Sequence, residues 1–109
     1  MNRFLAVFLV LAGAAQAETW RAMTGAEIAA ALTDRVLVYT DARQRFYASG
    51  RTLYDAGQES WGYWAVRGDQ YCSQWPPSDA WDCYDMATDG ASLRFIAADG
   101  SATDGTYAE

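Results

Sequence analysis

The 109-residue sequence contains no histidine and no lysine, and only two cysteines and two prolines. Without histidine, a chain cannot build Ser-His-Asp or Cys-His nucleophilic catalysis, and it lacks the commonest general base. Most zinc, copper and haem sites also need an imidazole ligand. We therefore expect no metal site, no cofactor and no catalytic residue, and we favour a protein that is not an enzyme.

All the cationic side chains are arginines, and carboxylates outnumber them. Eight Arg stand against fourteen Asp and Glu, a net charge of −6, which becomes −7 if the N-terminal segment that contains Arg3 is removed. An acidic surface repels the phosphates of nucleic acids and of anionic membranes. We therefore expect neither of these as a partner, and we attribute the acidity to solubility.

The first residues have the order of a secretory signal peptide. Residues 1–17, MNRFLAVFLVLAGAAQA, place Arg3 before an apolar run and end on Ala-Gln-Ala, which is the small-residue pattern of a cleavage site. The apolar run is shorter than the roughly 20 residues that a membrane-spanning helix needs. We expect one small β-rich domain over residues 18–109, periplasmic or secreted, without a stable membrane anchor after signal removal.

The two cysteines, Cys72 and Cys83, have ten residues between them. Disulfides persist in the oxidising environment that secreted proteins meet, and this spacing matches no redox motif. We therefore expect a structural Cys72–Cys83 disulfide, with Cα atoms about 4.4–6.8 Å apart. In the loop-entropy model, such a bridge adds about 3 kcal/mol to the free energy of unfolding.

The segment MTGAEIAAALTD predicts a single short helix. Thr24 and Glu27 have the spacing of a capping box, in which each side chain bonds a backbone amide at the helix start. Ile28 and Leu32 stand four apart and share one face. We expect the helix over about 25–34, followed by strands, because aromatic and β-branched residues then recur in short runs broken by Gly, Asp and Ser.

Turn residues set the expected pairing of the strands around the cysteines. A two-residue turn at Gly68-Asp69 pairs Ala65 with Cys72 and Val66 with Tyr71. The longer PPSDA loop then lets Cys72 lie beside Cys83. Further turns are expected across residues 41–43, at 49–50 and at 99–100, the last leading into a weak final strand.

The next hairpin has its expected turn at Asp89-Gly90. A two-residue loop there pairs Met86 with Leu93 and Asp85 with Arg94. With these registers, seven apolar side chains share one face, which we expect to be the core side. They are Trp64, Val66, Tyr71, Tyr84, Met86, Leu93 and Phe95.

The fold class predicted is mainly β (α+β), with one short N-terminal helix before a strongly curved antiparallel meander of seven or eight strands. A flat sheet of that size would leave its apolar face wet and its edges open. A small barrel or a strongly bent open sheet both avoid this, and the pattern does not choose between them. The helix would plug an end or cover a face.

The aromatic residues exceed what the core needs, and they suggest a binding surface. Four of them lie off the core face or at strand ends: Trp61, Tyr63, Trp75 and Trp81. Nearby polar groups that could orient a ligand are Gln74, Asp82 and Arg94. We expect a non-enzymatic binding or accessory protein for a small ligand, a glycan or a protein, unless the helix or the curled sheet covers these rings.

A hydrolase with paired carboxylates is the main alternative, using Asp82 with Asp85 or with Glu59. On one strand, however, Asp82 and Asp85 point to opposite faces. Most other aspartates, such as Asp89 and Asp99, stand beside a glycine, as turn residues do.

Taken together, TGAEIAAAL, FYASGRT, GYWAVRGDQYCSQW and the cysteine of WDCYDM resemble a family of small secreted proteobacterial proteins known only as a domain of unknown function. The resemblance implies a periplasmic or secreted β protein and carries no activity. The matching positions are Thr24 to Ile28, Tyr47 to Gly50, Gly62, Trp64, Val66, Cys72, Trp75 and Cys83, with Tyr63 between Gly62 and Trp64.

A second similarity, of architecture alone, is to periplasmic lysozyme inhibitors, which are also small disulfide-bonded β-barrels. The sequence has no recognisable counterpart of their inhibitory loop. This similarity implies a protein inhibitor of a cell-wall enzyme as a further alternative.

Overall fold

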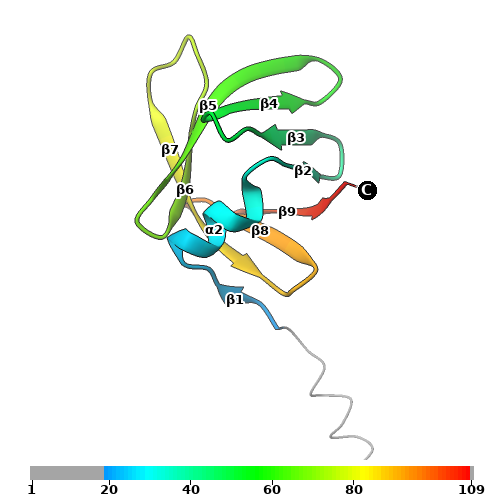
Figure 1. The fold of residues 1–109 in the computed structure, drawn as a ribbon, viewed down its shortest axis with the longest axis vertical. Helices are drawn as coiled ribbons and strands as arrows, with labels where there is room; N and C mark the ends of the chain where they lie inside the picture. Colours follow the sequence, from blue (N-terminus) through cyan, green and yellow to red (C-terminus); the bar gives the residue numbers. More distant parts are fainter. Residues whose placement is uncertain (1–18, 109) are drawn as a thin grey trace, which may run out of the picture.

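The computed structural model describes residues 19–108, so the predicted signal peptide lies outside the described residues. Within this range the chain forms one helix and nine strands (Figure 1). In chain order they are β1 (Arg21–Ala22), α2 (Gly25–Leu32), β2 (Arg35–Val38), β3 (Arg43–Phe46), β4 (Arg51–Asp55), β5 (Glu59–Arg67), β6 (Gln70–Gln74), β7 (Trp81–Thr88), β8 (Ser92–Ile96) and β9 (Ala102–Tyr107). No described helix has the length and apolarity needed to span a bilayer.

Strands β2 to β9 form a closed antiparallel barrel in which each strand pairs with its neighbour in sequence. The barrel closes where β9 meets β2, with Leu37 opposite Tyr107 and Val38 opposite Thr106. The short strand β1 pairs with the end of β7, beyond the part of β7 that pairs with β6. The predicted fold class is confirmed. Of the two forms that the sequence left open, the structure has the closed barrel, in which the eight strands have no free edges.

Helix α2 begins at the predicted capping box. Thr24 Oγ1 accepts the Glu27 N–H at 3.2 Å, and Glu27 Oε1 accepts the Thr24 N–H at 2.9 Å. The helix ends at Leu32, two residues earlier than predicted, because Asp34 adopts the left-handed conformation with a φ of 60°. Ile28 and Leu32 share the predicted face, and neither has exposed surface.

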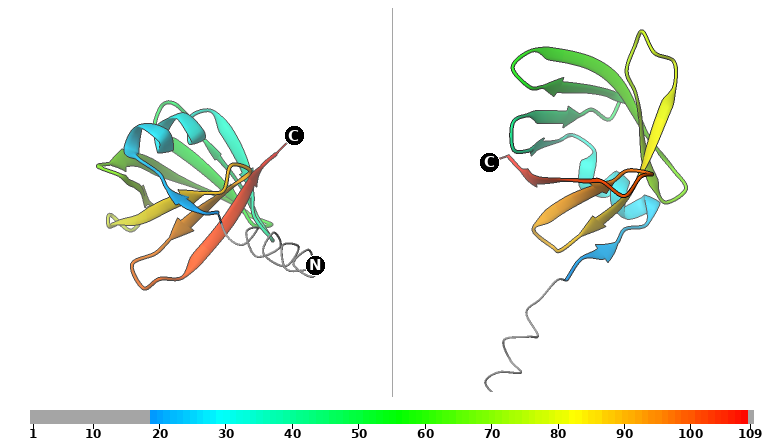
Figure 2. Two further views of the ribbon diagram at one scale, coloured as in Figure 1. Left: turned by 90° about the horizontal axis from the view of Figure 1, so that it is seen from below. Right: turned by 180° about the vertical axis from the view of Figure 1, so that it is seen from behind.

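The helix plugs one end of the barrel. It lies in front of the strands in Figure 1 and behind them in the opposite view (Figure 2, right). The Gly25 N–H donates to Asp69 Oδ1 in the β5–β6 turn at 2.7 Å. A Cβ at position 25 would collide with the Gly68 carbonyl oxygen, so glycine permits this close approach.

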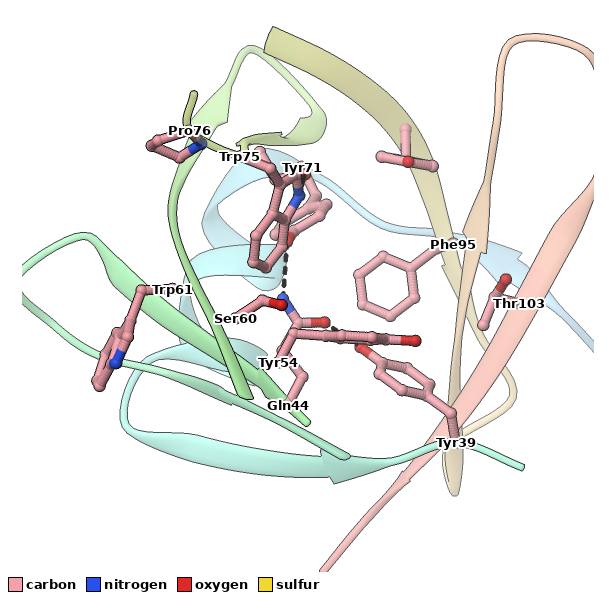
Figure 3. A pocket seen from close by; sticks show the side chains of 12 residues that line it. Tyr39, Gln44, Tyr54, Ser60, Trp61, Tyr71, Trp75, Pro76, Phe95 and Thr103 are labelled. Atoms are coloured by element: carbon pink, nitrogen blue, oxygen red, sulfur yellow. Dashed lines mark hydrogen bonds between the residues drawn. The ribbon is translucent and has the colours of Figure 1, made fainter. Parts of the chain in front are cut away.

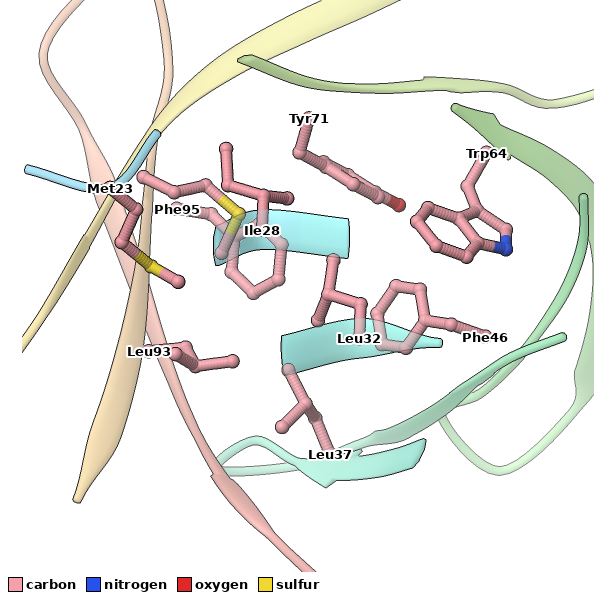
Figure 4. Packing of buried hydrophobic residues seen from close by; sticks show 10 residues of the cluster. Met23, Ile28, Leu32, Leu37, Phe46, Trp64, Tyr71, Leu93 and Phe95 are labelled. Carbon is pink, nitrogen blue, oxygen red and sulfur yellow. The ribbon is translucent and has the colours of Figure 1, made fainter. Parts of the chain in front are cut away.

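The packed core fills the half of the barrel next to α2 (Figure 4). The ring of Phe46 has no exposed surface and meets Trp64 and Tyr71 edge-to-face, with centroids 5.7 and 5.8 Å apart. The Trp64 indole N–H donates to the Tyr47 carbonyl oxygen at 2.9 Å. All seven residues of the predicted core face belong to this cluster or pack against it, with Val66 and Tyr84 partly buried.

The disulfide and the register around it are confirmed. Ala65 lies opposite Cys72, and Cys72 lies opposite Cys83, to which it is bonded. The Cα atoms are 4.0 Å apart, slightly below the predicted range. This is close to the roughly 4.5 Å of directly opposed pairs without mutual backbone hydrogen bonds. The bridge indicates an oxidising, extracytoplasmic environment.

The register predicted for the β7–β8 hairpin is wrong by two residues, because Met86 faces Phe95 rather than Leu93. The Asp89 carboxylate accepts the N–H groups of Ala91 and Ser92, at 2.9 and 2.7 Å, so the tip closes as a longer loop than two residues. A shift by an even number of residues keeps every side chain on its face. The predicted core face therefore survives the error.

The predicted Asp85–Arg94 pair is consequently also wrong, because Arg94 faces Ala87. Asp85 instead accepts from Gln70 Nε2 at 3.0 Å, and Arg94 forms a bidentate pair with Asp104 at 2.7 and 2.9 Å.

Candidate functional site

A cavity of about 590 Å³ lies at the barrel end opposite α2 (Figure 3). An eight-stranded barrel either fills its interior with side chains or holds one small ligand. Here one half is packed and the other is hollow. The described residues that line the cavity are Tyr39, Gln44, Tyr54, Ser60, Trp61, Tyr71, Ser73, Trp75, Pro76, Tyr84, Phe95 and Thr103.

A buried hydrogen-bond network forms the floor of the cavity around Gln44, which is 6% exposed. Thr52 Oγ1 donates to the Arg45 carbonyl oxygen at 2.7 Å, so it can only accept from Gln44 Nε2, 3.0 Å away. This fixes the orientation of the amide. Gln44 Oε1 accepts from the Tyr39 hydroxyl at 2.7 Å, and Nε2 also donates to the Tyr71 oxygen at 3.2 Å.

Trp75 forms part of the wall because Gly62 makes room for it. A Cβ at position 62 would come within 2.5 Å of the Trp75 ring. The indole also meets Tyr54 edge-to-face at 6.1 Å, and its N–H donates to Ser73 Oγ at 3.2 Å. On the opposite wall, Phe95 meets Tyr71 at 5.1 Å.

Burial makes three tyrosine hydroxyls that line the cavity harder to ionise. It raises the pKa of Tyr71 to about 12, although Gln44 and Ser73 lower it in part. Burial is also the largest cause that raises the pKa of Tyr39 far above its ordinary value. Burial first, and then the charge of Asp82, raise the pKa of Tyr84. At neutral pH these groups therefore act as hydrogen-bonding hydroxyls and not as phenolates.

The Tyr71 hydroxyl is expected to titrate near pH 12 in the folded protein, against about 10 in an unfolded chain. Because the folded pKa is the higher one, the stabilisation from this group is complete below about pH 10 and is lost as the pH rises toward 12. The absorbance at 295 nm of the wild type minus that of Tyr71→Phe should stay flat through pH 10. A difference step at pH 10 would mean that the hydroxyl is in contact with bulk water.

The predicted binding residues do not gather on one surface. Trp75 lines the cavity, and Trp61 borders it at the rim with its ring pointing away from the interior (Figure 3). Trp61 and Tyr63 are 45% and 43% exposed on the outer side of β5. The Arg51 guanidinium lies 4.4 Å from the centre of the Trp61 ring and 5.8 Å from that of Tyr63.

Trp81 lies on the outer side of β7, where the Arg67 guanidinium covers its ring at 4.4 Å. In the register of the sheet, the row of Ala65, Cys72 and Cys83 runs between these two residues. The Arg67–Trp81 pair therefore extends across the row of residues that contains the disulfide. Cys72 itself has no exposed surface.

The three predicted polar groups have separate positions. Gln74 Nε2 donates to the Asp79 carbonyl oxygen at 3.0 Å and so holds the β6–β7 loop. Asp82 is exposed and lies opposite Ser73, and Arg94 pairs with Asp104 away from the cavity. Whether any of the seven predicted residues binds a ligand or partner stays a prediction.

Sequence reasoning missed Tyr39, Gln44 and Tyr54 as site residues. A signal was present in RQRF, since strand alternation places Gln44 on the same side as the buried Phe46. A polar residue on a core face needs hydrogen-bond partners, and it therefore marks a buried network or a cavity.

The described residues hold no group of three or more Cys, Asp or Glu side chains placed to bind a metal ion. Asp89 and Asp99 instead accept backbone N–H groups within their own turns. Compared with protein-family models, with curated proteins and with solved structures, the chain shows no match, so its function is argued from the geometry of the cavity.

Proposed function

We propose that the chain is a periplasmic or secreted binding protein that takes a small, largely aromatic ligand into the open end of its barrel. The observation that carries this proposal is the cavity of about 590 Å³, walled by aromatic rings and floored by the Gln44 network. Ligand pockets are typically about 300–1,000 Å³, mostly apolar, with a few fixed polar groups. The cavity agrees with that description in size and in chemistry.

The lining also favours binding over the carboxylate-based hydrolase. The described lining residues offer hydroxyl and amide groups, and none of them is Asp or Glu. Glycoside chemistry needs two carboxyl groups facing one bond across a cleft. A floor whose hydrogen bonds are already fixed, as at Gln44, Thr52 and Tyr39, is suited to orienting a ligand without reorganisation.

The test uses N-phenyl-1-naphthylamine, a neutral aromatic fluorophore whose emission rises in apolar surroundings. We expect the wild type to bind it. Thr103→Trp fills the mouth of the cavity from β9 and should weaken binding at least about tenfold.

Thr106→Trp is the matched control, because Thr106 lies opposite Val38 on the outer side of the same strand. It should leave the affinity unchanged. The proposal fails if the fluorophore does not bind, or if both tryptophan variants weaken it equally.

A further inference from the structure

The donor and the acceptor of each hydrogen bond at the cavity floor can be assigned. The Thr52 hydroxyl donates its only proton to the Arg45 carbonyl oxygen, so Thr52 must accept a hydrogen bond from Gln44. The Gln44 amide then has to donate its second proton to Tyr71. Each step follows from the number of protons and lone pairs that these groups carry.

Tyr71 is the last residue of this hydrogen-bond network. Its oxygen accepts from Gln44 Nε2 at 3.2 Å, and among residues 19–108 no hydrogen bond donated by its hydroxyl is found. The Ser73 side chain also lowers the pKa of Tyr71, and Ser73 Oγ already accepts from the Trp75 indole N–H at 3.2 Å. The hydroxyl of Tyr71, a residue that lines the cavity, is therefore a donor available to whatever occupies it.

We propose that the ligand is a neutral, flat molecule with a hydrogen-bond acceptor, such as a carbonyl oxygen. This acceptor receives a hydrogen bond from the Tyr71 hydroxyl at the cavity floor. This inference rests on the binding function proposed above and specifies its ligand class.

The ligand is neutral because none of the described lining residues is charged. Burying a carboxylate or an ammonium group without a partner costs far more than burying a hydrogen-bonded neutral group. The hydroxyl of Tyr39 is already committed to Gln44 Oε1 and does not supply a second donor.

The ligand is flat because rings face the cavity from opposed walls. Trp75 and Tyr54 form the wall at β4 and β5, since Trp75 packs over Gly62. Phe95 comes from β8, half-way around the barrel, and Tyr39 packs against it at 6.0 Å. A planar molecule between such walls gains stacked or edge-to-face contacts on both sides.

The experiment compares three naphthalenes of similar shape as competitors of N-phenyl-1-naphthylamine. They are 2-acetonaphthone, which has a carbonyl acceptor, 2-ethylnaphthalene, which has none, and 2-naphthoate, which is an anion. We expect the wild type to bind 2-acetonaphthone about three- to tenfold more tightly than 2-ethylnaphthalene, the preference that one hydrogen bond confers. Binding of 2-naphthoate should be the weakest.

Tyr71→Phe should remove this preference while it leaves the affinity for 2-ethylnaphthalene within about twofold. Tyr47→Phe is the matched control, because Tyr47 stacks on Trp61 outside the cavity at 5.8 Å. It should keep the wild-type preference. A second measurement needs no variant, since the carbonyl stretch of bound 2-acetonaphthone should shift to lower frequency relative to an apolar solvent.

The possible failures are distinct. If the fluorophore does not bind, the proposed function fails and this inference fails with it. The binding function stands and this inference alone is overturned if the fluorophore binds but 2-acetonaphthone shows no advantage, if Tyr71→Phe preserves that advantage, or if 2-naphthoate binds best.

Discussion

Phe46→Ala is expected to lower the free energy of unfolding by about 3–5 kcal/mol. The Phe46 ring has no exposed surface and packs edge-to-face against both Trp64 and Tyr71, with centroids within 6 Å of both. Its removal would leave a void that the closed barrel cannot collapse to fill. Urea denaturation followed by tryptophan fluorescence measures the loss.

Tyr63→Ala is the matched control for this prediction. It removes a ring of similar size from the outer side of the barrel, where Tyr63 is 43% exposed. The loss there should stay below about 1 kcal/mol. If Phe46→Ala leaves too little folded protein to measure, Phe46→Leu should show a smaller loss of the same origin. Equal losses for Phe46→Ala and Tyr63→Ala would contradict the placement of the core.

Removal of the disulfide has the second largest expected effect. Cys72→Ala combined with Cys83→Ala should cost about 2–4 kcal/mol of stability, because the unfolded chain regains the freedom of the loop that the bridge closes. Alanine is preferred to serine because Cys72 is fully buried. The far-UV circular dichroism of the variant should keep its β signal, since Tyr71 still faces Tyr84 and the barrel still closes between β9 and β2.

Chemical reduction supplies the control for the disulfide variant. Dithiothreitol should destabilise the wild type by a similar amount and should leave the double alanine variant unchanged. A loss below about 1 kcal/mol, or a complete loss of β structure, would show that the bridge acts otherwise than by restricting the unfolded chain.

The helix start and most hairpins could be predicted from the sequence because their determinants are local. Thr24 and Glu27 are three residues apart, and the turn at Gly68-Asp69 fixes the pairing of the strands on either side. The β7–β8 register was missed for an equally local reason. The Asp89 side chain lengthens that turn, and the Asp-Gly pattern alone does not reveal which turn forms.

Which side chains point inward could also be predicted, but not what they surround. Strand alternation put Tyr71 and Phe95 on the core face, and both are buried. The same alternation applies whether a barrel is packed or hollow. For this reason the tryptophans predicted to form one binding surface lie in different places. Trp75 packs over Gly62 toward the interior, whereas the rings of Trp61 and Trp81 stack with arginines on the outer side.

The helix cap, the disulfide, the antiparallel meander and the inward face of its strands follow from the amino-acid sequence, because each depends on residues close together along the chain. Three features appear only in the folded barrel: β9 closes onto β2, Ile28 and Leu32 of the helix pack into the core at one end, and a cavity over Gln44 occupies the other end. Closure joins strands far apart in sequence. The empty volume depends on the radius of the closed barrel and on how deeply the helix enters it, and no local pattern carries either quantity.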